Sequence, residues 1–241
     1  MKPTIVLVHG AYADSSSWNG IIDPLLSDGH RLIAWSVSLR GVASDAAALT
    51  DLVRSDEGPV LLVGHAYGGA LLTNVSADAG DIVALVFVAG YALEPGEGCA
   101  DASGLTPGGT LGPTLERVPL SNGSVDTYIA QDKYHHPFCA DLPQEHPRLV
   151  AVTQRPIAES ALGEPSGDQP LWKSLPSSVL SGELYRNIPA GAQRIMADRA
   201  GAKRSLEIAG ASHVVGMSHP DETKQWSSRP PAPARQRRPE P

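Results

Sequence analysis

The chain has 241 residues, of which 41% are hydrophobic, and its formal net charge is −7. This length and composition suit one large α/β domain with a substantial core, and the negative charge argues against a nucleic-acid-binding surface. The two cysteines, Cys99 and Cys139, are too few for a disulfide framework or a metal cluster, so we expect buried or incidental thiols.

No apolar run approaches the roughly 20 residues that a membrane-spanning helix needs. The first residues lead straight into a predicted strand, so we expect no signal peptide and a cytoplasmic location.

Apolar, β-branched runs alternate with helix-forming segments in chain order. The predicted strands cover residues 4–10, which end in a glycine turn, 31–37, 60–63, 82–89, 177–182 and 204–209. The predicted helices cover residues 15–26, 44–54 and 189–199, and a further helix begins after the turn at 64–69. This alternation predicts βαβ units, hence a mostly parallel six-stranded sheet with helices on both faces.

The alternation stops between residues 95 and 176, which are rich in Gly, Pro and polar residues with short helical stretches only. We expect this segment to be an insertion that forms a cap over the carboxyl ends of the strands. Residues 1–94 and 177–222 then form the core. Residues 223–241 are rich in Pro and Arg, and their composition predicts a disordered tail.

The turn at residues 64–69 reads Gly-His-Ala-Tyr-Gly-Gly and joins an apolar strand to a helix-forming run. Strand, glycine turn and helix form the frame of G-x-S-x-G, the nucleophile elbow of α/β-hydrolases. Gly64 and Gly68 would let the strand and helix backbones pack closely around a strained central residue. That central residue is Ala66, which has no nucleophilic atom.

Acyl transfer also needs a general base, a group that orients the base, and donors for the oxyanion. The predicted donors are the backbone N–H groups of Tyr67, which follows the elbow residue, and of Ala11, in the loop after the first strand. We interpret His9 as a structural histidine that braces that loop. The predicted base is His213, in the loop after the last strand, and His219 is interpreted as structural.

The chain resembles the bacterial α/β-hydrolases related to plant methylesterases and hydroxynitrile lyases. The resemblance covers residues 3–94 and 170–222. It rests on His-Gly-Ala-Tyr-Ala-Asp-Ser-Ser-Ser-Trp at 9–18, Gly-His-Ala-Tyr-Gly-Gly at 64–69, Ile-Pro at 188–189 followed by Gln-Arg-Ile-Met-Ala-Asp-Arg-Ala-Gly at 193–201, and Ser-His-Val at 212–214.

The resemblance implies an α/β-hydrolase fold and a serine carboxylesterase that acts on a small apolar ester or lactone without a cofactor or metal. In this family a serine stands where the chain has Ala66, and an aspartate stands where it has Tyr185. Glu183 and Glu94 are alternative acids that the spacing leaves open. We expect no nucleic-acid or membrane partner, and a homodimer stays open.

Three hypotheses remain at this point. The chain is an esterase that has lost its nucleophile, or an enzyme that uses His213 as a base without a covalent intermediate, as in a lyase, cyclase or dehydratase. The third hypothesis is a pseudoenzyme that binds a small apolar ligand in the hydrolase pocket.

Overall fold

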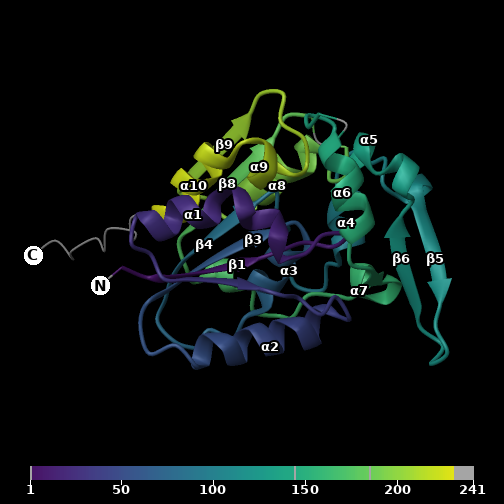
Figure 1. Ribbon diagram of the computed structural model, residues 1–241. Helices are drawn as coiled ribbons and strands as arrows, with labels where there is room; N and C mark the ends of the chain where they lie inside the picture. Colours follow the sequence, from purple (N-terminus) through teal and green to yellow (C-terminus); the bar gives the residue numbers. More distant parts are fainter. Residues whose placement is uncertain (1, 144, 185, 231–241) are drawn as a thin grey trace, which may run out of the picture.

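Six parallel strands form the central sheet of the computed structural model, which describes residues 2–143, 145–184 and 186–230 (Figure 1). The strands are β1 Thr4–Val8, β2 Leu32–Trp35, β3 Val60–His65, β4 Ile82–Val88, β8 Ser177–Gly182 and β9 Arg204–Ile208. Their order is β2-β1-β3-β4-β8-β9, and all neighbouring pairs are parallel. The predicted α/β fold with a six-stranded sheet is confirmed.

The strand order changes direction between β1 and β3, because β1 leads to β2 on one side and β3 leads to β4 on the other. Val8 pairs with Gly64 in the register of these two strands. The loops that follow β1 and β3 therefore begin side by side. In open α/β sheets, ligands bind at such a switch point beyond the carboxyl ends of the strands.

Helices cover both faces of the sheet, as Figure 1 shows. One layer contains α1 Asn19–Ser27, α9 Val215–Ser218 and α10 Pro220–Ser228, and the other contains α2 Val42–Arg54 and α3 Tyr67–Asn74. The 3₁₀ helix η1 Ser15–Trp18 precedes α1, and α8 Ala190–Arg199 joins β8 to β9. Across the described ranges, no helix combines the length and apolar character that a bilayer crossing requires.

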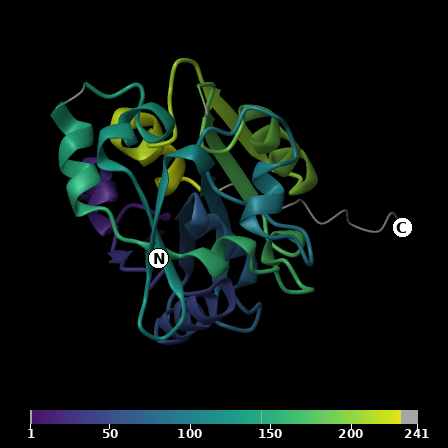
Figure 2. The ribbon, with the colours of Figure 1, turned by 90° about the vertical axis from the view of Figure 1, so that its right-hand side faces the viewer.

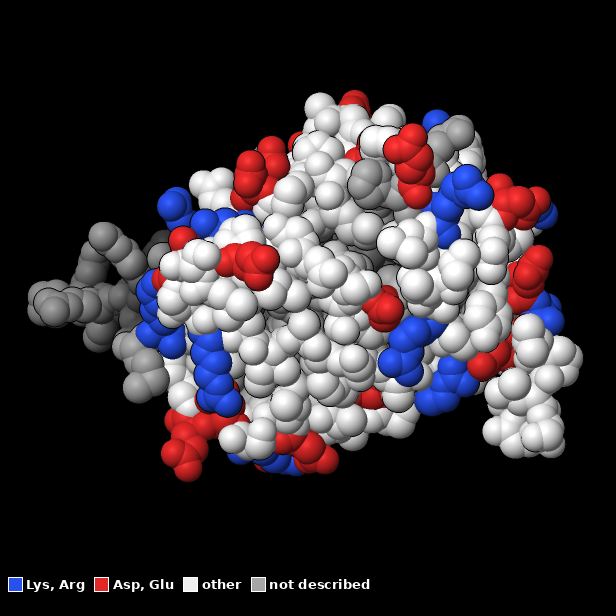
Figure 3. Space-filling view, viewed as in Figure 1, with Lys and Arg blue, Asp and Glu red and all other residues white. Residues whose placement is uncertain are grey.

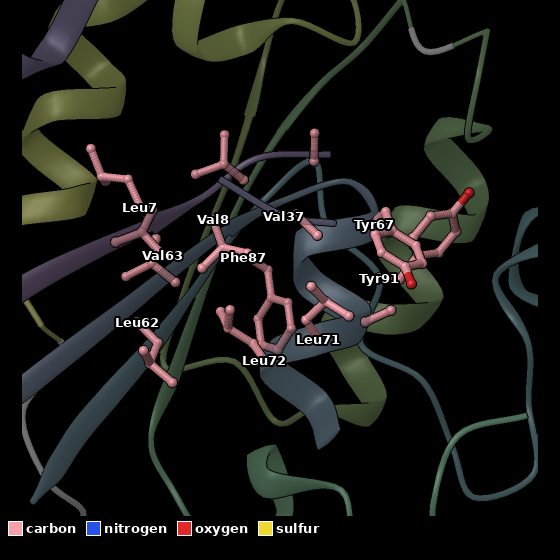
Figure 4. Close-up of a cluster of buried hydrophobic side chains, with 14 of the residues drawn as sticks. Leu7, Val8, Val37, Leu62, Val63, Tyr67, Leu71, Leu72, Phe87 and Tyr91 are labelled. Atoms are coloured by element: carbon pink, nitrogen blue, oxygen red, sulfur yellow. The ribbon is translucent and has the colours of Figure 1, made fainter. Parts of the chain in front are cut away.

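The core lies between these layers. Every residue of β1 and β3 is buried, as expected for central strands of a parallel sheet that is covered on both faces. Figure 4 shows the Phe87 side chain of β4 beside Leu71 and Leu72 of α3, with Tyr67 and Tyr91 at one end of the cluster. Cys99 and Cys139 are free and buried, as the sequence predicts.

Residues 95–176 contain a second sheet, which the expectation of short helical stretches only did not include. Its antiparallel strands are β5 Leu115–Pro119, β6 Val125–Ile129 and β7 Ile157–Ala158. The same segment holds the helices α4 Cys99–Ser103, α5 His135–Phe138, α6 Glu145–Thr153 and α7 Glu159–Gly163, and the 3₁₀ helices η2 Gly112–Thr114, η3 Gln131–Lys133 and η4 Leu171–Lys173.

The missed signal is the Asn122-Gly123 pair between β5 and β6. Gly123 has φ 84°, and the N–H of Leu120 donates to the carbonyl of Ser124 at 2.8 Å, which closes the hairpin. Asn-Gly between two β-prone runs is a strong hairpin signal. In Figure 1 this hairpin and α4–α7 lie beyond the carboxyl ends of the central strands, and Figure 2 shows the molecule from that side.

The predicted disordered tail is wrong for residues 223–228, which continue helix α10. Pro220 occupies its first turn with two acidic residues, an arrangement that favours a helix start. Thr223, Trp226 and Ser227 are buried on one helix face, and the guanidinium of Arg204 lies 4.2 Å from the centre of the Trp226 ring. Residues 229–230 follow the helix without regular secondary structure, and residues 231–241 lie outside the described residues.

Trp226→Ala should therefore lower the free energy of unfolding by about 3 kcal/mol, the usual cost of removing a large buried aromatic side chain. The change should be read from chemical denaturation at pH 7. The control is Leu149→Ala, whose side chain on α6 is 70% exposed and should cost less than about 0.5 kcal/mol. Equal effects of the two changes would contradict the packing of α10 on the core.

Candidate active site

The turn between β3 and α3 holds Ala66 in a strained backbone conformation, with φ 49° and ψ −117°. A residue with a Cβ atom rarely has positive φ, and such strain persists only where the surroundings impose it. Here the N–H of Ala66 donates to the carbonyl of Val88 at 3.3 Å, and its carbonyl accepts from Gly69 at 2.9 Å and Tyr91 at 3.2 Å. The turn thus has the geometry of a nucleophile elbow.

Two glycines allow this close approach of backbones, as the sequence predicts. A Cβ atom on Gly64 would lie 2.8 Å from the carbonyl of Gly68, and one on Gly68 would overlap the carbonyl oxygen of Val8 in β1. Any side chain at either position would push α3 away from the sheet and displace Ala66.

The loop after β1 lies directly against the elbow. A Cβ atom on Gly10 would be 2.7 Å from the Cβ of Ala66. Ala11 and Tyr67, whose N–H groups are the predicted oxyanion donors, are 7% and 1% exposed. Within the described part of the chain, neither N–H has a protein acceptor. Buried N–H groups without a protein acceptor are the kind of donor that can stabilise a negatively charged oxygen.

His9 braces the β1 loop. Its Nε2 accepts from the N–H of Val37 at 3.0 Å, so Nδ1 carries the proton and donates to the carbonyl of Gly10 at 2.8 Å. Burial lowers the pKa of His9, which keeps the ring neutral in this arrangement. These contacts agree with the structural role expected for this histidine.

His213 lies in the loop after β9 and is 1% exposed. Its ring centre is 4.6 Å from that of His65, the neighbour of Ala66, and the Nε2–H of His65 donates to the His213 carbonyl at 2.9 Å. The structure therefore places His213, the predicted base, against His65, the residue before Ala66. Burial, and then the nearby His65, hold the pKa of His213 well below 6.5, so the ring is neutral, as a general base must be.

Side chains from the 95–176 segment complete the surroundings of His213, and sequence reasoning missed all of them. The ring of Phe138 lies 4.8 Å from that of His213, and the hydroxyl of Tyr134 donates to the carbonyl of Tyr12 at 2.6 Å. Asp141 accepts from the N–H of Ser212 at 3.0 Å and thereby fixes the histidine loop. No local motif marks these residues, because their contacts depend on how the segment folds over the sheet.

The predicted acid position, Tyr185, lies outside the described residues. The two alternative carboxylates are engaged elsewhere. Glu183 is exposed and accepts from the N–H of Gly210 at 3.0 Å, and Glu94 pairs with the ammonium of Lys173 at 2.8 Å. His219 accepts from or donates to the hydroxyl of Ser218 at 2.9 Å and is partly exposed, which agrees with a structural role.

A narrow, mostly apolar cavity adjoins His65. It is lined by His65, Trp18 and Val214 from the core and by Phe138 and Val150 from the 95–176 segment. Its volume is about 10 Å³, which is about the space that one water molecule needs. Figure 3 shows a hollow on this side, between the helices α1 and α9 and the segment that carries α6.

The buried histidines make stability depend on pH. Burial is the main reason that the pKa of His65 falls from 6.5 to about 4. As the pH drops below 6.5, the unfolded chain takes up a proton at this residue before the folded chain does, so acid favours unfolding. Between pH 7 and pH 4.5 this residue should remove about 2 kcal/mol of stability.

His65→Gln keeps a donor for the His213 carbonyl but removes the titrating ring. In chemical denaturation, the variant should lose about 2 kcal/mol less than the parent chain between pH 7 and pH 4.5. Equal losses in the two proteins would show that His65 is not held neutral by burial.

Solved structures with this fold include several esterases. Polyneuridine aldehyde esterase matches with a TM-score of 0.77 and 18% sequence identity over 94% of this chain and 98% of that one. The methylesterase protein MES16 from Arabidopsis matches with a TM-score of 0.74 and 15% identity over 93% and 96%. A variant of tomato Methylketone Synthase I complexed with β-ketoheptanoate matches with a TM-score of 0.73 and 19% identity over 93% and 95%.

Sequence comparison agrees with the structural matches. Methylesterase 2 of Arabidopsis thaliana is 26% identical over 177 residues, which cover 64% of this chain and 66%, just under two thirds, of that relative. Residues 5–226 match the sequence profile of the "Alpha/beta hydrolase family". With the parallel sheet, the elbow and the histidine loop in place, the chain belongs to the α/β hydrolase family and is related to the plant methylesterases.

Proposed function

We propose that this chain is an α/β-hydrolase of the serine carboxylesterase type whose elbow carries no nucleophile. It binds a small apolar ester or lactone and forms no acyl-enzyme. The observation that carries this proposal is Ala66, in strained elbow geometry beside two buried N–H groups without a protein acceptor among the described residues. Ala66 thus occupies the nucleophile position of a site that keeps its oxyanion donors.

The oxyanion donors are backbone groups, so they do not depend on the side chain at residue 66. Tyr67 is the first residue of the eight-residue helix α3, where the helix dipole adds partial positive charge. A ligand carbonyl whose carbon lies above Ala66 would place its oxygen between the N–H groups of Ala11 and Tyr67. These groups therefore support binding of a polarised carbonyl.

The mostly apolar lining of the cavity beside His65 favours a small apolar ligand. Trp18, Phe138 and Val150 give this lining an aromatic and aliphatic character. Because Phe138 and Val150 belong to the 95–176 segment, we infer that this segment is a cap that separates from the core when the ligand enters. The methylesterases among the relatives support an ester of a short alcohol as the first ligand to test.

A second function is favoured by the neutral, buried His213. A reaction that passes through an enolate needs oxyanion donors and a proton-transfer group but no nucleophile. Loss of carbon dioxide from a β-keto acid is such a reaction. The structural match to a Methylketone Synthase I bound to β-ketoheptanoate makes a β-keto acid the probe for this alternative.

Ala66→Ser should create acyl-enzyme chemistry, because the new hydroxyl joins oxyanion donors and a base that are already in place. Turnover of a short-chain p-nitrophenyl ester should rise from none to a measurable rate with an initial burst. Adding Tyr185→Asp should raise kcat well above the single change, since loss of the orienting aspartate costs a serine protease about 10⁴ in kcat.

The control is His213→Ala in the double variant, which should remove both the burst and the turnover. A folded double variant with neither burst nor turnover would contradict the esterase proposal. The unmodified chain can also be tested with a β-keto acid. If it converts that acid and His213→Ala abolishes the conversion, the non-covalent reaction replaces the esterase proposal.

A further inference from the structure

A buried carboxylate contacts the residue that follows Ala66 in the elbow. Asp45, in the first turn of α2, is 1% exposed. It accepts from the N–H of Arg40 at 3.2 Å, from the hydroxyl of Ser38, and from the hydroxyl of Tyr67 at 3.0 Å. A buried carboxylate with three donors is satisfied, so breaking one contact leaves the others in place.

One of these donors belongs to the residue whose backbone forms the proposed oxyanion hole. Tyr67 is 1% exposed, and its only side-chain polar atom is used on Asp45. Burial, and then the charge of Asp45, raise the pKa of Tyr67 well above 10, so the hydroxyl keeps its proton and remains a donor. The side chain of Tyr67 is thereby anchored at its far end, and the backbone of the same residue begins α3 directly after Ala66.

The same carboxylate holds the turn after β2. Leu39, between the two other donors to Asp45, has φ 60°, and its carbonyl accepts from the N–H of Ala158 in β7 at 2.9 Å. Arg40 pairs with Asp126 of β6 at 2.6 Å. The Asp45 carboxylate therefore contacts both the start of α3 and a turn that is bound to the second sheet.

We propose that Asp45 is a positioning residue, which acts through the Tyr67 hydroxyl to hold the Tyr67 N–H in the direction of the oxyanion. This inference rests on the proposed function of that N–H. It adds a charged residue from a different element, α2, to a site otherwise made from the loops after β1, β3 and β9.

An oxyanion contact strengthens in the transition state, so a misplaced donor lowers kcat more than it changes KM. Removing one such donor costs about 10²–10³ in kcat. Tilting a donor that is still present should cost less, and we expect about a tenfold loss.

The test uses the Ala66→Ser chain and a short-chain p-nitrophenyl ester. Tyr67→Phe, which removes only the hydroxyl, should lower kcat about tenfold and change KM by less than about twofold. Asp45→Asn should have a similar effect. If Asp45 acts through Tyr67, the two changes together should equal one change alone rather than multiply to about 100-fold.

The matched control is Asp51→Asn, the same substitution on the same helix at an exposed residue that pairs with Arg54. It should leave kcat within about twofold. A Tyr67→Phe variant with unchanged kcat, or two changes whose effects multiply, would overturn the positioning role. Either result leaves the acyl-enzyme burst of Ala66→Ser intact, so the proposed function is judged separately.

A second measurement needs no activity. In the unmodified chain, the N–H of Gly69 donates to the Ala66 carbonyl at 2.9 Å and reports on the shape of the elbow. Asp45→Asn and Tyr67→Phe should each speed amide hydrogen exchange at Gly69 at least about tenfold, and Asp51→Asn should not. If exchange at Gly69 is the same in all four proteins, Asp45 does not hold the elbow.

Discussion

The backbone of β3 turns into α3 with no room for a side chain at Gly64 or Gly68, and the position of Ala66 follows from that constraint. The two glycines bring the first turn of α3 against β3 and β1. This close packing of α3 against the strands forces Ala66, between the two glycines, into a strained conformation. Hydrogen bonds to Val88, Gly69 and Tyr91 maintain that conformation. Strain of this type costs about 1–3 kcal/mol and persists at sites where geometry matters for function.

Two loops, and one side chain of the 95–176 segment, surround the turn that holds Ala66. The switch in strand order puts the loop after β1 beside the elbow, and the loop after β9 brings His213 to it through His65. From the opposite side, Phe138 packs on the His213 ring. The rings of His65 and His213 are buried by this packing, and burial keeps both histidines neutral.

The core fold and the elbow could be predicted from sequence because their signals are local. Alternating apolar runs mark the strands, and the glycine pattern around Ala66 marks the turn. The Phe138 and Asp141 contacts could not be predicted, since they join segments about 70 residues or more apart in the chain without a motif. Asp45 was missed for a related reason: in the sequence it is one acidic residue in an alanine-rich helix, and only packing against α3 buries it.

The central claim is that residue 66 is the nucleophile position of an otherwise assembled oxyanion site. An alkyl fluorophosphonate tests it most directly, because this reagent bonds to a serine that a base activates and oxyanion donors support. Intact-mass analysis should show no adduct on the unmodified chain and a single adduct, mapped to residue 66, on Ala66→Ser. A folded Ala66→Ser protein without an adduct, or an adduct of the unmodified chain at another residue, would contradict the account.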